Sequence, residues 1–177
     1  MLKDKKILAG GAVLFVAAFW FYIKPNYMDA KPAPVYTKEQ IDSSPHPTVM
    51  LGRTVTVGAH ATGNAPEGLV LNLKAPSTSP SYVKAIIALE FERPEKPWVG
   101  VSGDALTAKN VEFTHELEHE MPKILDAVAT VFASKTADQI ATVDGREELK
   151  TELIEAINEH LPAEKVETIY FETLITQ

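Results

Sequence analysis

Cysteine is absent from this chain of 177 residues. Its absence excludes disulfide bonds, thiolate catalysis and metal sites with sulfur ligands, although it does not select a cellular compartment. A surplus of positive charge is also missing, because 17 Lys and Arg stand against 24 Asp and Glu and give a formal net charge of -7. Without a basic field there is little to attract a phosphate backbone, so we expect no nucleic-acid partner.

Several motifs of enzymes and nucleotide-binding proteins are missing as well. The sequence contains no G-x-S-x-G nucleophile elbow, no G-x-x-x-x-G-K-[ST] phosphate loop and no G-x-G-x-x-G dinucleotide fingerprint. The many carboxylates reflect an acidic surface, and no spacing selects two of them as an acid and a base. We therefore expect no cofactor.

One long uncharged run is present, at residues 7–23, which read ILAGGAVLFVAAFWFYI. This length is at the short end of what can span a bilayer. Its aromatic end resembles an interfacial belt and no convincing small-residue cleavage site follows, which favours a retained membrane anchor over the alternative, a cleaved signal peptide. The side chains that we expect to hold the anchor in the bilayer include Ile7, Leu14, Phe15, Phe19, Trp20 and Ile23.

The charges around this run predict the topology of the chain. Lysines at positions 3, 5 and 6 place residues 1–6 in the cytoplasm and everything beyond Lys24 outside it. Residues 24–47 contain five prolines and no sustained periodicity, so we interpret them as an extended stalk. Residues 48–177 then form the extracytoplasmic domain.

Apolar periodicity within residues 48–177 predicts an α+β domain. Residues 69–73 and 83–91 alternate as strands with one buried face, and residues 48–57 are a weaker strand candidate. Residues 92–109 have no clear period and are predicted as a loop. A final strand is expected at residues 166–176, with Ile169, Phe171 and Ile175 on one face.

Two helices are expected between these strands. The first covers residues 110–134 with a kink at Pro122, and a connector follows at residues 135–143. The second begins at a capping box formed by Asp144 and Glu147 and ends before Pro162. Both should pack on one face of a mostly antiparallel sheet. The predicted core of the first helix is Phe113, Leu117, Met121, Leu125 and Val128.

A possible zinc motif lies inside the first predicted helix. His115, Glu116 and His119 match H-E-x-x-H, in which two His bind zinc and the Glu activates water. On a helical wheel, however, both His lie about 160° from the buried Leu117 and should face solvent. The extended form of the motif would need Gly at position 122 and His at position 125, where this chain has Pro and Leu.

Four acids of the second helix could supply a third ligand, but they should face solvent too: Glu148, Glu152, Glu155 and Glu159. We therefore interpret the motif as the polar face of a helix, with His115 and His119 as weak metal candidates. A membrane-anchored zinc hydrolase that uses His115, Glu116 and His119 is kept as the alternative function.

The C-terminal part of the chain carries a set of short motifs: Met121-Pro122, Ser134-Lys135-Thr136, Gly145, Ile157-Asn158 and the strand that ends at Gln177. In these motifs the chain resembles the FliL family of flagellar basal-body-associated proteins. The strands at residues 69–73 and 83–91 and the single N-terminal anchor are similar too. The likeness covers most of the chain and is most specific in its C-terminal third.

This resemblance implies a non-enzymatic, single-pass protein of the bacterial inner membrane. Its outer domain would have a stomatin-like (SPFH-like) fold, form a homo-oligomeric ring and support the ion-driven stator units of the flagellar motor. A scaffold for another membrane complex is a further alternative. No catalytic residue, metal or cofactor is implied.

Overall fold

A computed structural model describes residues 34–53, 68–76 and 78–177. The residues expected in the membrane anchor lie outside these ranges. Within the described ranges, no helix combines the length and the apolar character that crossing a bilayer requires. The folded unit comprises Thr37–Gln177.

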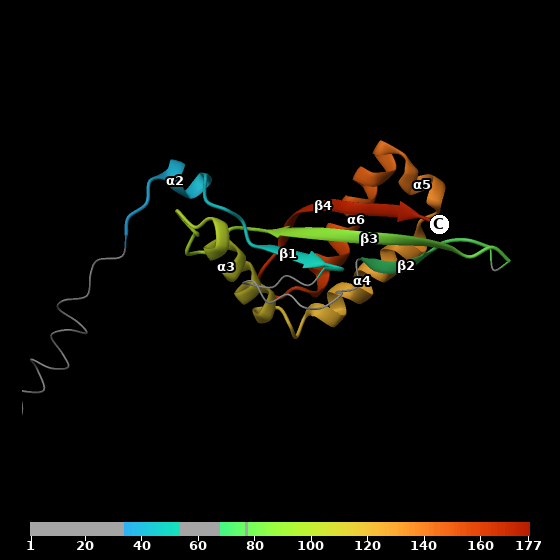
Figure 1. The fold of residues 1–177 in the computed structure, drawn as a ribbon, viewed down its shortest axis with the longest axis horizontal. Coiled ribbons are helices and arrows are strands. Elements are labelled where there is room, and N and C mark those ends of the chain that lie inside the picture. The colour runs from blue at the N-terminus through green and yellow to red at the C-terminus, as the bar shows by residue number, and fades with distance from the viewer. Residues whose placement is uncertain (1–33, 54–67, 77) are drawn as a thin grey trace, which may run out of the picture. The chain divides into compact units, whose positions relative to one another are not determined.

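The described part of this unit has an antiparallel sheet built around one long strand, β3 (Ser81–Phe91). Strand β4 (Val166–Thr176) pairs with nearly the whole of β3 on one side. On the other side, β1 (Thr48–Leu51) and β2 (Leu69–Leu73) follow each other along the same edge (Figure 1). The predicted α+β class with an antiparallel sheet is confirmed.

The hydrophobic core lies between one face of the sheet and two long helices, α4 (Met121–Ser134) and α6 (Val143–His160). Alternate residues of β3 point into this core and are fully buried: Val83, Ala85, Ile87, Leu89 and Phe91. The opposite, outer face carries exposed apolar side chains at Val70, Tyr82, Tyr170 and Ile175. The period of two in β3 therefore separates a buried face from a partly exposed one.

The predicted face of the last strand is wrong at one residue. Ile169 is buried and Phe171 packs against the core, but Ile175 is 53% exposed. The register between β3 and β4 shifts at Ile86/Ile87, where a bulge inserts an extra residue into β4. Because one extra residue reverses the alternation, Leu174 packs against the core in place of Ile175.

The predicted single helix at residues 110–134 is in fact two helices. Helix α3 (Gly103–Glu116) ends at a turn over residues 117–120, and α4 begins at Met121. Pro122 therefore lies in the first turn of α4, where a missing N–H costs nothing, and it does not kink a longer helix. The predicted loop at residues 92–109 is also too long, because α3 already begins at Gly103.

The predicted connector at residues 135–143 contains a short helix, α5 (Ala137–Ala141). Thr142 caps α6, since its side chain accepts a hydrogen bond from the Gly145 N–H at 3.0 Å. The capping box predicted at Asp144 and Glu147 is therefore wrong by two residues, and Asp144 lies in the first turn of the helix.

The chain enters the folded unit earlier than the predicted domain start at residue 48. Helix α2 (Lys38–Asp42) has a capping box at Thr37, and the following residues are bonded to the end of β3 and the loop after it. The Phe91 N–H donates to the Pro47 carbonyl at 2.9 Å, and Arg93 donates to the Asp42 carbonyl at 2.7 Å. We call residues 37–47 the entry segment.

Strand β1 is shorter than the predicted strand at residues 48–57, because it ends at Leu51 and is followed by Gly52. Gly52 has a φ of +83°, and a Cβ there would lie 2.8 Å from the Leu69 nitrogen. Glycine is therefore required for both conformation and space. The Gly68 N–H donates to the Gly52 carbonyl at 2.8 Å, so the ends of β1 and β2 are tied together.

Candidate functional site

The residues of the H-E-x-x-H motif do not share one helix. His115 and Glu116 lie in the last turn of α3, whereas His119 lies in the turn that follows. All three are exposed, and the His115 side chain is 82% exposed. The spacing of four residues therefore does not place the two imidazoles side by side, as zinc ligation on a helix requires.

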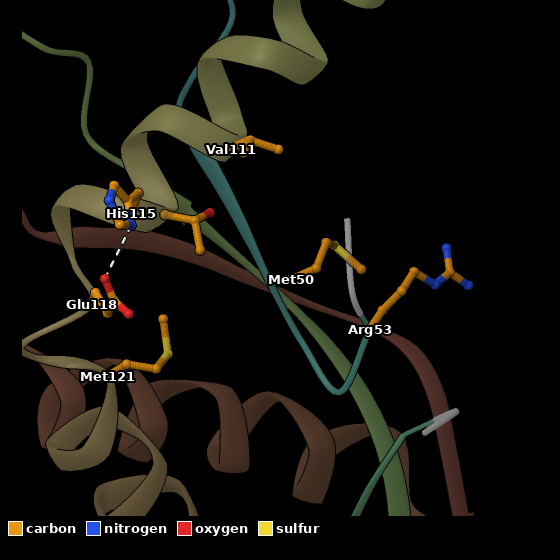
Figure 2. Close-up of a pocket in the computed structure, with 7 residues that line it drawn as sticks. Met50, Arg53, Val111, His115, Glu118 and Met121 are labelled. Carbon is orange, nitrogen blue, oxygen red and sulfur yellow. Dashed lines mark ion pairs between the residues drawn. The ribbon is translucent and has the colours of Figure 1, made fainter. Parts of the chain in front are cut away.

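His115 is engaged with a neighbour of its own segment. Its Nδ1 lies 3.0 Å from Oε2 of Glu118, an exposed pair visible in Figure 2. Among the described residues, no group of three or more His, Asp or Glu side chains is arranged to hold a metal ion. Glu155 and Glu159 are exposed on α6, and His160 is exposed in its last turn.

The same segment forms one wall of a groove of about 350 Å³ between β1 and α3. Figure 2 shows the side chains of both walls, with Val111 extending toward the side of Met50 and Arg53 extending away from α3. Met50 and Arg53 come from the β1 side, and Val111, Thr114, His115, Glu118 and Met121 from the other. We call this space the β1–α3 groove. Its lining combines three apolar side chains with four polar or charged ones.

Arg53, which lines the groove, forms an ion pair across the sheet. Arg53 Nη2 lies 2.6 Å from Oε1 of Glu172, the residue of β4 at the bulge. Because β1 and β4 flank opposite edges of β3, this ion pair spans the outer face of the central strand. Both side chains are about half exposed, so the pair positions Arg53 more than it stabilises the fold.

Two of the acids on α6 converge on a lysine. Lys135 is buried, and its Nζ lies 2.6 Å from Glu152 and 3.2 Å from Glu148. The hydrogen bond that Lys135 donates to Glu152 raises the pKa of Lys135 above its ordinary value, burial opposes this rise, and the hydrogen bond to Glu148 adds to it. The Lys135 carbonyl also accepts from the Lys74 N–H at 2.8 Å, which ties the end of β2 to the end of α4.

His46, expected in the stalk, is in fact bound to the sheet. Its Nδ1 lies 2.9 Å from the Phe91 carbonyl and 3.3 Å from a carboxylate oxygen of Glu167. Both neighbours are acceptors, so Nδ1 carries the proton and donates. The histidine therefore fastens the entry segment to both long strands.

The five residues predicted for the helix core are divided between α3, the turn and α4. Phe113, Leu117 and Val128 are buried, and Met121 and Leu125 are partly buried against the same core. Phe113 also contacts the rings of Phe91 and Trp98, at centroid distances of 5.0 and 6.4 Å. These side chains hold the groove wall in place.

Comparison with known proteins agrees with the resemblance found in the sequence. The model of a family described as flagellar basal body-associated protein FliL matches residues 64–177. The chain belongs to the FliL family. Flagellar protein FliL of Aquifex aeolicus (strain VF5) is 30% identical to it over 110 residues, which is 59% of this chain and 68% of that protein.

The FliL-like motif residues have identifiable structural roles in this chain. Ser134 donates to the Val131 carbonyl and ends α4, Lys135 binds the two acids of α6, and Thr136 caps α5. Gly145 allows α6 to pass close to α5, because a Cβ there would lie 1.8 Å from the Gln139 carbonyl oxygen. These four residues therefore build the scaffold, whereas Met121 of the Met121-Pro122 motif lines the β1–α3 groove.

Sequence reasoning missed three features of this FliL-family domain: the groove, the Lys135 cluster and the His46 contacts. A signal existed only for Lys135, since it lies within a motif and precedes a helix with a regular acidic stripe. The groove joins residues far apart in sequence, so no local pattern could reveal it.

Proposed function

We propose that this chain is a membrane-anchored, non-enzymatic accessory protein of the bacterial flagellar motor. The family match over residues 64–177 is the observation that carries this proposal. The apolar run at residues 7–23, with basic residues before it, supports a single-pass anchor in the inner membrane and an extracytoplasmic C-terminal domain. Ile7, Leu14, Phe15, Phe19, Trp20 and Ile23 are the side chains proposed to hold it there.

The proposed action is binding to the ion-driven stator units. Copies confined to one membrane gain effective concentration, so even weak contacts between stomatin-like domains can build a ring around a stator unit. A ring that binds the assembled stator better than the free unit stabilises the assembled state by mass action. This action needs no catalytic residue.

Deletion of the gene tests this function. We expect the deletion strain to swim more slowly, with the largest loss in viscous medium, because stator units must stay bound under load. Swimming speed as a function of viscosity and the number of stator units per motor, counted with a fluorescent stator protein, measure the effect. A matched strain carries the same domain on an unrelated single-pass anchor and should swim normally. Wild-type stator numbers and torque in the deletion strain would contradict the proposal.

A further inference from the structure

Two groups of contacts hold the entry segment to the domain, and Arg93 makes the outer group. Its guanidinium donates to the Asp42 carbonyl at 2.7 Å and to the Ser44 carbonyl at 3.4 Å. Arg93 is exposed, so water competes for both bonds. Helix α2, which precedes these contacts, has no buried residue. The outer contacts should therefore break at a small cost in free energy.

The inner group of contacts lies at the end of β3. His46 donates to the Phe91 carbonyl at 2.9 Å and lies 3.3 Å from a carboxylate oxygen of Glu167, and the Pro47 carbonyl accepts from the Phe91 N–H. The His46 side chain is only 17% exposed, and Pro47 is buried. Because water reaches these contacts less easily than those of Arg93, the entry segment should peel away from its N-terminal end.

The hydrophobic core begins after the entry segment. Within the described ranges, the first core side chain along the chain is Val49 of β1, which is fully buried, and Leu51 follows on the same face. Strand β1 also pairs with β3 along its whole length. Apolar burial is the dominant favourable term in folding, whereas a polar contact adds little net free energy. Opening the entry segment should therefore cost less free energy than opening β1.

We propose that the entry segment is a releasable strap, which detaches from the end of β3 while β1 and the rest of the domain stay folded. When the strap is docked, the 13 residues 24–36 join the apolar run to the domain, and release adds the 11 residues of the strap. A five-residue helix such as α2 is not stable alone, so the released strap can extend. At about 3.3–3.6 Å per residue, the maximum length of this tether rises from about 45 Å to about 80 Å.

The longer tether would let the domain stay bound to a partner at a greater distance from the membrane. This use rests on the anchor in the proposed function, whereas the release itself does not. The strap is the first part of the folded unit after the apolar run, so a pull from the membrane acts on it before it acts on β1. A pulling force favours the longer state, and the tether would lengthen without loss of the sheet.

The absence of cysteine allows single thiols to report this release. Ser44 is 5% exposed, so the thiol of Ser44→Cys is protected while the strap is docked. Ser43→Cys, at the exposed neighbouring position, gives the rate of unprotected labelling. Val49→Cys lies in the core and is labelled only when β1 opens. Purified full-length variants in detergent are labelled with a polyethylene glycol maleimide, and circular dichroism confirms that each is folded.

We expect Ser44→Cys to be labelled at least about tenfold more slowly than Ser43→Cys and at least about tenfold faster than Val49→Cys, because the strap opens locally. Equal rates for Ser44→Cys and Val49→Cys would overturn the inference, since release would then require the domain to unfold. Equal rates for Ser44→Cys and Ser43→Cys would also overturn it, since the segment would not be docked. Val83→Cys, equally buried in β3, replaces Val49→Cys if that variant does not fold.

A second substitution tests the outer contacts. Adding Arg93→Ala should raise the labelling rate of Ser44→Cys at least about fivefold, the effect of losing one net hydrogen bond, and should leave the rate of Val49→Cys unchanged. Lys96→Ala, at an exposed position of the same loop, is the matched control and should change neither rate. The same rate for Ser44→Cys with either substitution would contradict the role of Arg93 as the outer fastening of the strap.

The labelling rates and the swimming assay can fail separately. If Ser44→Cys is labelled as expected but the deletion strain swims normally, the strap stands and the proposed function is wrong. If the deletion strain loses speed in viscous medium but Ser44→Cys is labelled no faster than Val49→Cys, the strap is wrong and the proposed function stands.

Discussion

At the scale of single residues, Lys135 connects more of the fold than any other charged side chain described above. Its ammonium group binds Glu148 and Glu152 of α6, and its carbonyl binds the end of β2. A buried ammonium group must be matched by hydrogen bonds and opposite charge, and the two carboxylates provide both. Lys135 therefore holds α4, α6 and the sheet in register.

Replacing Lys135 by Met should destabilise the domain by about 1–2 kcal/mol, since charge-assisted hydrogen bonds are lost while both acids can be solvated. Chemical denaturation of the purified domain measures this change. Lys150→Met is the matched control, because Lys150 forms a solvated pair with Glu147 and should have little effect. If both variants lost the same free energy of unfolding, the cluster of Lys135, Glu148 and Glu152 would have no special role in stability.

The pH dependence of stability gives a further readout for the same pair of variants. The pKa of Lys135 in the folded state is raised above its ordinary value of 10.5. A raised pKa means that the folded state holds the proton of Lys135 more tightly than the unfolded state does. The stabilisation that the charged Lys135 contributes to folding is therefore fully present below pH 10.5 and is lost as pH rises through the folded pKa. Lys135→Met should lack this alkaline loss, whereas Lys150→Met should keep it.

At the scale of elements, α5 and α6 meet where no side chain fits. A Cβ at Gly145 would lie 1.8 Å from the Gln139 carbonyl oxygen, and the Thr142 hydroxyl is also near, at 2.9 Å. Gly145→Ala must therefore move a backbone and should cost about 3 kcal/mol, at the upper end for overpacking. Thermal unfolding measures the loss. Glu155→Ala on the exposed face of α6 is the control, and a stable Gly145→Ala domain would show that α5 can shift freely.

The elements also differ in how well their sequences predict them. Strand β3 was predictable because its alternate residues are all buried. Helix α3 was missed over residues 103–109, since Phe113 is its only buried side chain and one residue makes no stripe. The reversal of Ile175 depends on a bulge near Glu172, which follows from pairing with β3 and has no local signal.

At the scale of the whole molecule, the entry segment is part of the folded unit. Asp42, Ser44, His46 and Pro47 form four hydrogen bonds with β3 and the following loop, and His46 also contacts Glu167 of β4. A composition rich in proline cannot reveal such contacts, because their partners lie more than forty residues away in sequence. The β1–α3 groove could not be predicted for the same reason, because its two walls are also far apart in sequence.

Removing the entry segment should therefore weaken the domain. We expect a fragment of residues 48–177 to be less stable than one of residues 37–177 by about 4 kcal/mol, the sum of four hydrogen bonds at roughly 1 kcal/mol each. Urea denaturation of the two fragments measures the difference. A fragment of residues 34–177 should match the longer one, and identical midpoints for all three would place the start of the domain at residue 48.

The bond between Gly68 and Gly52 has a practical use. Because it joins the ends of β1 and β2, the chain leaves the sheet at Gly52 and returns to it at the same point. The cost of closing a loop grows only slowly with its length. A fluorescent protein or an affinity tag could therefore be inserted between these two glycines without separating the strands, which would report the position of the domain in living cells while leaving both termini unmodified.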